Sequence, residues 1–241
     1  MSYCPRCGTA RDEADQFCSS CGARFDAAGD ALPEAVDVQR LAGRARVVTW
    51  LLVATAILAL FSFGSTFAEM NLLQRALDGG VVTEAEANAN DERQAALAGI
   101  RLMLIIATGV AWLMWQHRAQ SNLRRWRPDA RTTPGWAVGW WFIPFANLFM
   151  PYRTMRELWQ GSTSQGALSE PSTRISLWWV AYLGSNGLIS ASAFVIDQTS
   201  SLQEFITSTQ LAMAGHAVTI AAALAAAGIV RGITVAQLAR A

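Results

Sequence analysis

Long apolar blocks, each with the length of a membrane crossing, restrict the fold of this 241-residue chain more than any other feature. The first block runs from Val47 to Ala68 without a charged residue. As a helix it would be about 33 Å long, enough to cross a hydrocarbon core of about 30 Å. Three further blocks follow at Ala96 to Trp115, Ile175 to Ile196 and Phe205 to Val230. Charged residues are only 15% of the chain and lie mainly between the blocks, so the sequence predicts an all-α multi-pass membrane helical bundle.

The stretch PGWAVGWWFIPFANLFMPYRTMRE, residues 134–157, decides the topology. If residues 135–151 do not cross, thirteen arginines outside the spans fall on one side of the membrane, and only Arg75 and Arg93 fall on the other. If they cross, the count becomes eight against seven. Only the first count obeys the positive-inside rule, and Pro144 lacks the N–H that a spanning helix would use. We therefore predict four spans plus a re-entrant or interfacial hairpin, with the N- and C-termini cytoplasmic; a bundle of five spans is the alternative.

Three tryptophans in this stretch suit the head-group region of a bilayer, where an amphipathic ring has both apolar and polar surroundings. They are Trp136, Trp140 and Trp141. Packed against the four spans, a hairpin broken at Pro144 would have its freed backbone groups satisfied by protein or water.

Polar residues elsewhere in the bundle carry three further signals. Thr83 and Glu86 have the spacing of a capping box, which predicts a helix that starts there and continues into the second span. Arg101 lies inside that span, near its outer end, where it either snorkels to the membrane surface or serves a function. His216, inside the last span, is either a hydrogen-bond donor to a neighbouring helix or part of a polar cavity.

The N-terminal segment has the cysteine spacing of a zinc site. Two Cys-x2-Cys pairs supply four thiolates, the ligand set of a structural tetrahedral Zn²⁺. The four ligands are Cys4, Cys7, Cys18 and Cys21. The sequence therefore predicts a zinc ribbon at residues 1–25, a linker at 26–43 and the membrane domain at 44–235. A zinc ion bound by four cysteine ligands has no open coordination position, so this zinc is expected to be structural and not catalytic.

The charge of the segment argues against nucleic acid as its partner. Residues 1–30 contain three arginines against five acidic residues, and four thiolates with one Zn²⁺ add two more negative charges. An acidic ribbon repels phosphate, so we expect a cytoplasmic protein partner through residues 1–25 and no nucleic acid.

The middle of the chain resembles the bacterial membrane family catalogued as domain of unknown function 4328. The resemblance rests on Trp115-x2-Arg118-x3-Asn122, Pro134-Gly135-Trp136, Gly139-Trp140-Trp141-Phe142-x-Pro144, Asn147 and Pro151-Tyr152. It runs from about residue 45 to 235 and implies a multi-pass protein of the bacterial cytoplasmic (inner) membrane without an established activity. A zinc ribbon ahead of the domain also fits the family.

Arg118 and Asn122 are expected to hold the hairpin in place. On a helix they share a face with Trp115 at the cytoplasmic boundary. We expect them to hydrogen-bond the backbone around Pro144 and Asn147, or else to anchor the helix to lipid phosphate.

The sequence favours a non-catalytic integral membrane protein, a scaffold or regulatory protein with a cytoplasmic zinc-binding interaction module. It has no carboxylate within the spans for a proton relay and no recognisable nucleophile or nucleotide-binding motif, so an enzyme is not expected. The alternatives are a small transporter or channel gated by the re-entrant hairpin, or a lipid-acting membrane enzyme. Membrane lipid is an expected partner, and an oligomer is compatible with the sequence.

Overall fold

The computed structural model describes residues 2–3, 10–12, 16–17, 25, 38–163, 173–198 and 201–240, which fall into two compact units, Met1–Asp37 and Val38–Ala241. In the first unit, β1 (Ser2–Tyr3) pairs antiparallel with β2 (Ala10–Arg11). The Phe25 N–H donates to the Gln16 carbonyl oxygen at 3.0 Å. All four predicted zinc ligands, Cys4, Cys7, Cys18 and Cys21, lie outside the described residues.

The second unit is helical throughout its described elements. Its helices are α1 (Val38–Leu77), α2 (Glu84–Trp126), α3 (Pro134–Gly139), η1 (Trp140–Phe142), η2 (Ala146–Leu148), α4 (Met150–Thr163), α5 (Thr173–Gln198) and α6 (Leu202–Leu238). Helix α1 begins inside the predicted linker 26–43, so the last residues of that linker are helical. The predicted all-α class is confirmed for this unit.

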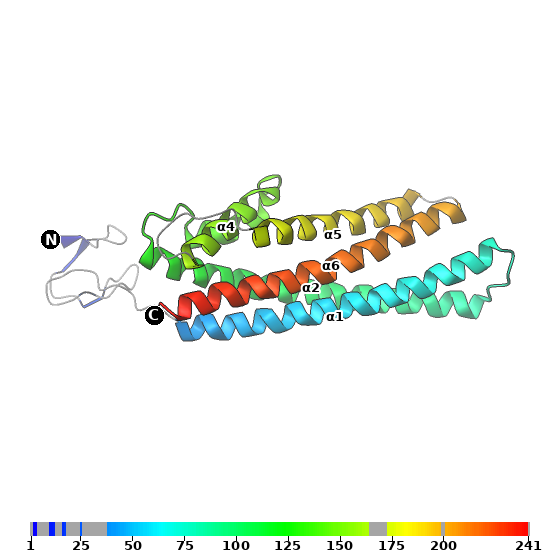
Figure 1. Ribbon diagram of the computed structural model, residues 1–241, viewed down its shortest axis with the longest axis horizontal. Coiled ribbons are helices and arrows are strands. Elements are labelled where there is room, and N and C mark those ends of the chain that lie inside the picture. Colours follow the sequence, from blue (N-terminus) through cyan, green and yellow to red (C-terminus); the bar gives the residue numbers. More distant parts are fainter. Residues whose placement is uncertain are drawn as a thin grey trace. The chain divides into compact units, whose positions relative to one another are not determined.

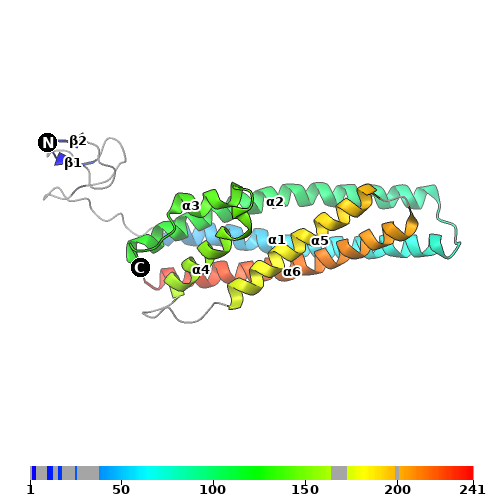
Figure 2. The same cartoon turned by 90° about the horizontal axis from the view of Figure 1, so that it is seen from above.

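The four long helices form two antiparallel hairpins, α1 with α2 and α5 with α6 (Figures 1 and 2). Helix α1 also lies along α6, which joins the hairpins. At the end opposite the α1–α2 loop, Gln237 of α6 donates to the Ala119 carbonyl oxygen of α2 at 3.0 Å. It also donates to Ser162 of α4 at 2.9 Å. The ends of α2, α4 and α6 therefore meet, and α3, η1 and η2 lie at this same end (Figure 2).

Three helices of the described chain are long and apolar enough to cross a membrane: Gln39–Leu77, Glu84–Trp126 and Leu202–Leu238. They contain the predicted first, second and last spans, and they make this a membrane protein. Helix α5, with 26 residues, is about 39 Å long, which is also sufficient. Its polar positions, among them Ser185 and Asn186, lower its hydropathy, so its crossing stays a prediction.

The stretch 135–151 does not form a spanning helix. Helix α3 has six residues and is about 9 Å long, and two single-turn 3-10 helices follow it. The helical structure is interrupted between η1 and η2, at Pro144 as predicted. This arrangement is compatible with the predicted hairpin and has no continuous helix for a fifth span in this stretch.

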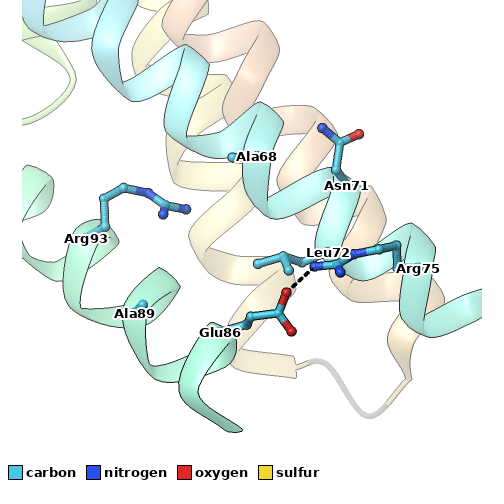
Figure 3. A pocket seen from close by; sticks show the side chains of 7 residues that line it. All are labelled: Ala68, Asn71, Leu72, Arg75, Glu86, Ala89 and Arg93. Atoms are coloured by element: carbon cyan, nitrogen blue, oxygen red, sulfur yellow. Dashed lines mark hydrogen bonds and ion pairs between the residues drawn. The ribbon is translucent and has the colours of Figure 1, made fainter. Parts of the chain in front are cut away.

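The predicted capping box is confirmed at the start of α2. The Glu86 N–H donates to Thr83 Oγ1 at 3.2 Å, and the Thr83 N–H donates to Glu86 Oε2 at 3.0 Å. From this cap α2 runs unbroken into the second span. Glu86 also accepts from Arg75 Nη2 of α1 at 2.8 Å, and both residues line a hollow between the two helices (Figure 3).

These contacts give a testable pH dependence outside the membrane. The backbone hydrogen bond from Thr83, and then the Arg75 guanidinium, lower the pKa of Glu86 from 4.5 to about 2. A depressed carboxyl pKa stabilises the loop above pH 4.5, and this stabilisation is lost as the pH falls toward 2. We expect the protection of the amides at residues 78–86, measured as the exchange rate relative to the intrinsic rate at the same pH, to fall over that window. Glu86→Gln should remove the pH dependence, and an unchanged profile in Glu86→Gln would contradict this assignment.

Candidate functional site

Six aromatic side chains pack together where α2, η1 and α5 meet. They are Trp112, Trp115, Trp141, Trp178, Trp179 and Tyr182, named here the aromatic cluster. The Trp112 and Trp178 rings stack across α2 and α5 with centroids 5.4 Å apart. Trp141 of η1 meets Trp112 and Trp179 edge-on, at 6.3 and 5.9 Å. Such offset and edge-to-face pairs are favourable. They attach residues 135–151, named here the broken stretch, to the long helices α2 and α5.

Gln116 is the polar centre of this cluster. It is fully buried on α2, and its Oε1 accepts from Trp112 Nε1 at 3.1 Å and from Trp141 Nε1 at 2.9 Å. One carbonyl oxygen thus satisfies two indole donors that would otherwise be buried without a partner. Gln116 therefore holds η1 against α2.

Two further side chains, Trp179 and Glu157, fasten the broken stretch to α5 and α4. Trp179 Nε1 of α5 donates to the Leu148 carbonyl oxygen of η2 at 3.1 Å. The Glu157 carboxylate of α4 accepts from the N–H groups of Arg131 and Thr132 and from the Thr132 hydroxyl, just before α3. The stretch is therefore held at both ends.

The break itself is a strained turn. The Ala146 N–H donates to the Pro144 carbonyl oxygen at 2.8 Å, across Phe145 at φ 64° and ψ −45°. This is a γ-turn of the rare positive-φ kind, which is costly for a residue with a bulky side chain. Phe145 is 83% exposed, and its neighbours Phe142 and Phe149 are exposed too. An exposed apolar group of this kind fits insertion into the lipid interface.

Phe145→Gly separates the strain from the exposed ring. Glycine adopts positive φ without a steric penalty, so the free energy of unfolding in detergent should rise by about 1 kcal/mol. Association of the stretch with lipid should weaken, because the exposed phenyl ring is lost. Thermal unfolding in detergent and quenching of tryptophan fluorescence by brominated lipid measure the two effects. Phe142→Gly, at a position with negative φ, is the matched control and should not be stabilised.

A cavity of about 310 Å³ lies within the bundle, enclosed by one face of each of the four long helices and by η1. Helix α2 contributes Arg101, Leu104, Ile105, Thr108 and Trp112, whose spacing of three, four, seven and eleven places them on one face. Its size falls in the range of small-molecule pockets. We name it the α2–α5 cleft.

The α2–α5 cleft is open on the side of α2 and η1. Ile105 and Phe142 line it and are nevertheless 52% and 71% exposed. The backbones of α1 and α6 lie close together, whereas those of α2 and α5 stay apart in the described chain and the two helices meet through side chains such as Trp112 and Trp178. In a membrane this opening faces the acyl chains of the lipid.

The cleft is polar at one end and aromatic at the other. Arg101 and His216 line it toward the α1–α2 and α5–α6 loops, and Trp112 and Trp178 line it toward η1. Eleven residues of helix separate Arg101 from Trp112, or about 16 Å. No carboxylate is among the described residues that line the cleft. Of the two alternatives predicted for His216, the structure therefore favours the second, a place in a cavity. Arg101 faces the cleft as well.

Several polar groups of the lining are used within their own helices. Thr55 and Thr219 donate to the carbonyl oxygens of Leu51 and Gly215, at 2.9 and 2.8 Å. The Asn186 amide donates to the Tyr182 carbonyl oxygen at 2.7 Å. These donors are therefore not free for a ligand, which leaves Arg101 and His216 as the cationic and basic groups of the cleft.

The predicted tryptophans take different positions. Trp115 is fully buried, and its Nε1 donates to Thr234 Oγ1 of α6 at 3.1 Å. Trp141 belongs to the aromatic cluster. Trp136 and Trp140 stack with centroids 4.5 Å apart, and Trp136 is 51% exposed, which fits a place in the head-group region.

The predicted pinning of the hairpin by Arg118 and Asn122 stays a prediction. Asn122 is fully buried and its Oδ1 accepts from Arg125 at 3.5 Å, while its Nδ2 has no partner in the described chain. The Asn147 N–H donates to the Ile143 carbonyl oxygen at 2.9 Å, within the broken stretch. Pro144 is exposed and Pro151 is buried in the first turn of α4.

The residues that visibly hold the stretch were missed from the sequence. Gln116 and Glu157 carry no motif, and Trp179 was read only as part of the apolar span. One signal was present: Gln116 directly follows the apolar block that ends at Trp115, next to two tryptophans of the same helix, and an amide that becomes buried there needs partners. Its partner Trp141 is 25 residues away, so spacing alone does not reveal it.

A helical bundle with an internal cleft, a broken tryptophan-rich stretch and an N-terminal cysteine module defines a polytopic membrane protein with a small accessory domain. The chain belongs to the family described as Domain of unknown function (DUF4328), which matches residues 78–235. A zinc-ribbon domain matches residues 3–25. Both resemblances inferred from the sequence are thereby confirmed, the first over a shorter range. No curated protein and no solved structure matches the chain.

Proposed function

We propose that this protein is a non-catalytic membrane scaffold or regulatory protein that holds a ligand with a hydrocarbon chain in the α2–α5 cleft. The observation that carries the proposal is the cleft itself, a mostly apolar cavity of about 310 Å³ inside the bundle and open beside α2. Ligand sites are concave and mostly apolar, with a few placed polar groups. The zinc ribbon supplies the interaction module, with termini and ribbon in the cytoplasm and membrane lipid around the bundle.

The polar lining supports a binding role over catalysis. The hydroxyls of Thr55 and Thr219 donate to carbonyl oxygens of their own helices. Ser185 does the same, to the Tyr182 carbonyl oxygen at 2.9 Å. A nucleophile needs a base within hydrogen-bonding reach, and these three hydroxyls are directed elsewhere. The hydroxyl of Thr108, which also lines the cleft, forms no hydrogen bond with a base among the described residues. A lipid-acting enzyme is therefore the weakest of the alternatives.

Photolabelling with a neutral, long-chain alcohol that carries a diazirine tests the proposal on the full-length protein in detergent. We expect labelled peptides from the cleft faces of α2 and α5. Gly109 lines the cleft, and a Cβ built on it meets no atom within 4 Å. Gly109→Leu should place a side chain into the open part of the cleft and reduce labelling at least fivefold.

Gly99→Leu is the matched control. Gly99 lies on the same helix, is exposed and also has open space at its Cβ, but it does not line the cleft. It should label like the wild type. Labelling spread evenly over all lipid-facing surfaces, or unaffected by Gly109→Leu, would refute the proposed binding.

A small transporter gated by the hairpin is the second candidate, and one observation favours it. Trp141 and Phe142 of η1 line one end of the cleft, so movement of the broken stretch would change how far the cleft opens at that end of the bundle. This candidate predicts that the protein moves an amphiphile between the leaflets of proteoliposomes, whereas a scaffold does not.

Comparing the partners held by the full chain and by a chain without residues 1–25 tests the scaffold.

A further inference from the structure

The α2–α5 cleft contains a cation without an anion. Arg101 lies within the second apolar block and lines the cleft. Among the described residues, no side chain forms an ion pair or a hydrogen bond with its guanidinium. A charge at membrane depth is costly unless it is paired, hydrated or extended to the surface, so arginines there usually face a partner or a functional cavity.

The acidic residue of α1, Glu69, is already engaged. Glu69 of α1 accepts from the amides of Asn90 and Gln94, at 3.4 and 2.9 Å. Gln94 precedes Arg101 by seven residues, two helical turns or about 10 Å. The other arginine of this region, Arg93, donates to Ser65 at 2.8 Å and to Asn90 at 2.6 Å. The bundle thus satisfies Arg93 and Glu69 and leaves Arg101 to the cleft.

Two uncharged polar side chains, His216 and Thr108, line the cleft together with Arg101. His216 of α6 lines the same cleft and has no hydrogen-bonding partner in the described chain. Thr108 lies seven residues after Arg101, on the same face of α2, and its Oγ1 is buried without a partner in the described chain. Beyond Thr108 the wall becomes aromatic at Trp112 and Trp178. One end therefore suits a charged oxygen group, and the rest suits a hydrocarbon chain.

We infer that the ligand of the α2–α5 cleft is an anionic amphiphile whose carboxylate or phosphate head group binds Arg101 and His216, with its hydrocarbon chain directed toward Trp112. The inference rests on the proposed function and names the ligand class of that site. Guanidinium binds planar carboxylate and phosphate groups through paired hydrogen bonds, and the low dielectric around it strengthens the contact. The hydrocarbon chain replaces lipid against the aromatic wall.

Displacement of the neutral diazirine alcohol from the full-length protein provides the test. The competitors share one chain and differ in the head group: palmitate, hexadecanol and hexadecyltrimethylammonium. Palmitate should compete at least tenfold better than hexadecanol, because a charge-assisted hydrogen bond is added, and the quaternary ammonium should compete worst. Dipalmitoyl phosphatidate against palmitate then decides whether the head group comes from a phospholipid or from a free fatty acid.

Substitutions at two arginines of α2 localise the effect. Arg101→Gln should remove the preference for palmitate and leave displacement by hexadecanol unchanged, whereas Arg101→Lys should keep most of it. His216→Gln should weaken palmitate a few-fold. Arg93→Gln, outside the cleft lining, should keep the full preference, and retained labelling by the neutral alcohol shows that each variant is folded.

The outcomes separate the inference from the proposed function. If the wild type does not retain the neutral label in the cleft, the proposed function fails and the inference fails with it. If the label is retained but palmitate and hexadecanol compete equally, only the inference is overturned. A preference for palmitate that survives Arg101→Gln overturns it as well, because the head group then binds elsewhere.

Discussion

Trp115→Ala should lower the free energy of unfolding by about 3–5 kcal/mol, the usual cost of emptying a large aromatic site in a core. Trp115 has no exposed surface, and its ring centroid lies 5.3 Å from that of Trp112. Its Nε1 donates to Thr234 Oγ1 across 119 residues of sequence, which joins α2 to α6. Removing the ring leaves a cavity and also deprives the Thr234 hydroxyl of its donor.

Two further variants make this result specific. Trp115→Phe keeps most of the packing and loses only the indole hydrogen bond, so it should cost about 1–3 kcal/mol. Trp50 of α1 is 68% exposed, and Trp50→Ala should change stability little. Unfolding by a denaturing detergent, followed by circular dichroism, measures all three. Equal losses for Trp115→Ala and Trp50→Ala would show that Trp115 does not hold the helices together.

The long helices could be predicted because their signals are local. An apolar block identifies a span wherever its neighbours lie, and the Thr83–Glu86 capping box acts within four residues. The break at Pro144 is local as well, since proline removes an N–H from any helix. These features of the sequence correspond closely to the helices found, apart from helix ends that extend beyond the apolar blocks.

The contacts that build the candidate site could not be predicted in this way. Gln116 meets Trp141, and Gln237 meets Ala119, across 25 and 118 residues. Such pairs depend on how helices pack, and hydropathy does not encode which faces meet. The same holds for Arg101: its depth in the span was evident, but its direction into a cleft follows from the rotation of α2 relative to α5. The sequence could therefore offer two roles for Arg101 without choosing between them.

Replacing Cys18 and Cys21 together by serine should abolish zinc binding by the full-length protein. Each Cys-x2-Cys pair supplies two of the four thiolates, and two remaining ligands do not hold a structural Zn²⁺ at protein concentrations. Metal analysis should give one zinc per wild-type chain and none in the double variant. Ser19→Ala, between the same two cysteines, is the matched control and should retain the metal.

The double variant should also lose the fold of its N-terminal unit, because short metal domains depend on their metal for stability. Trypsin should then cleave at Arg6, Arg11 and Arg24, while the helical signal stays unchanged, since residues 1–37 and 38–241 form separate compact units. Zinc retained in full by the double variant would refute the four-thiolate site. If the zinc-free protein keeps every partner of the wild type, the ribbon is not the docking module, and a scaffold would have to bind its partner through the membrane domain.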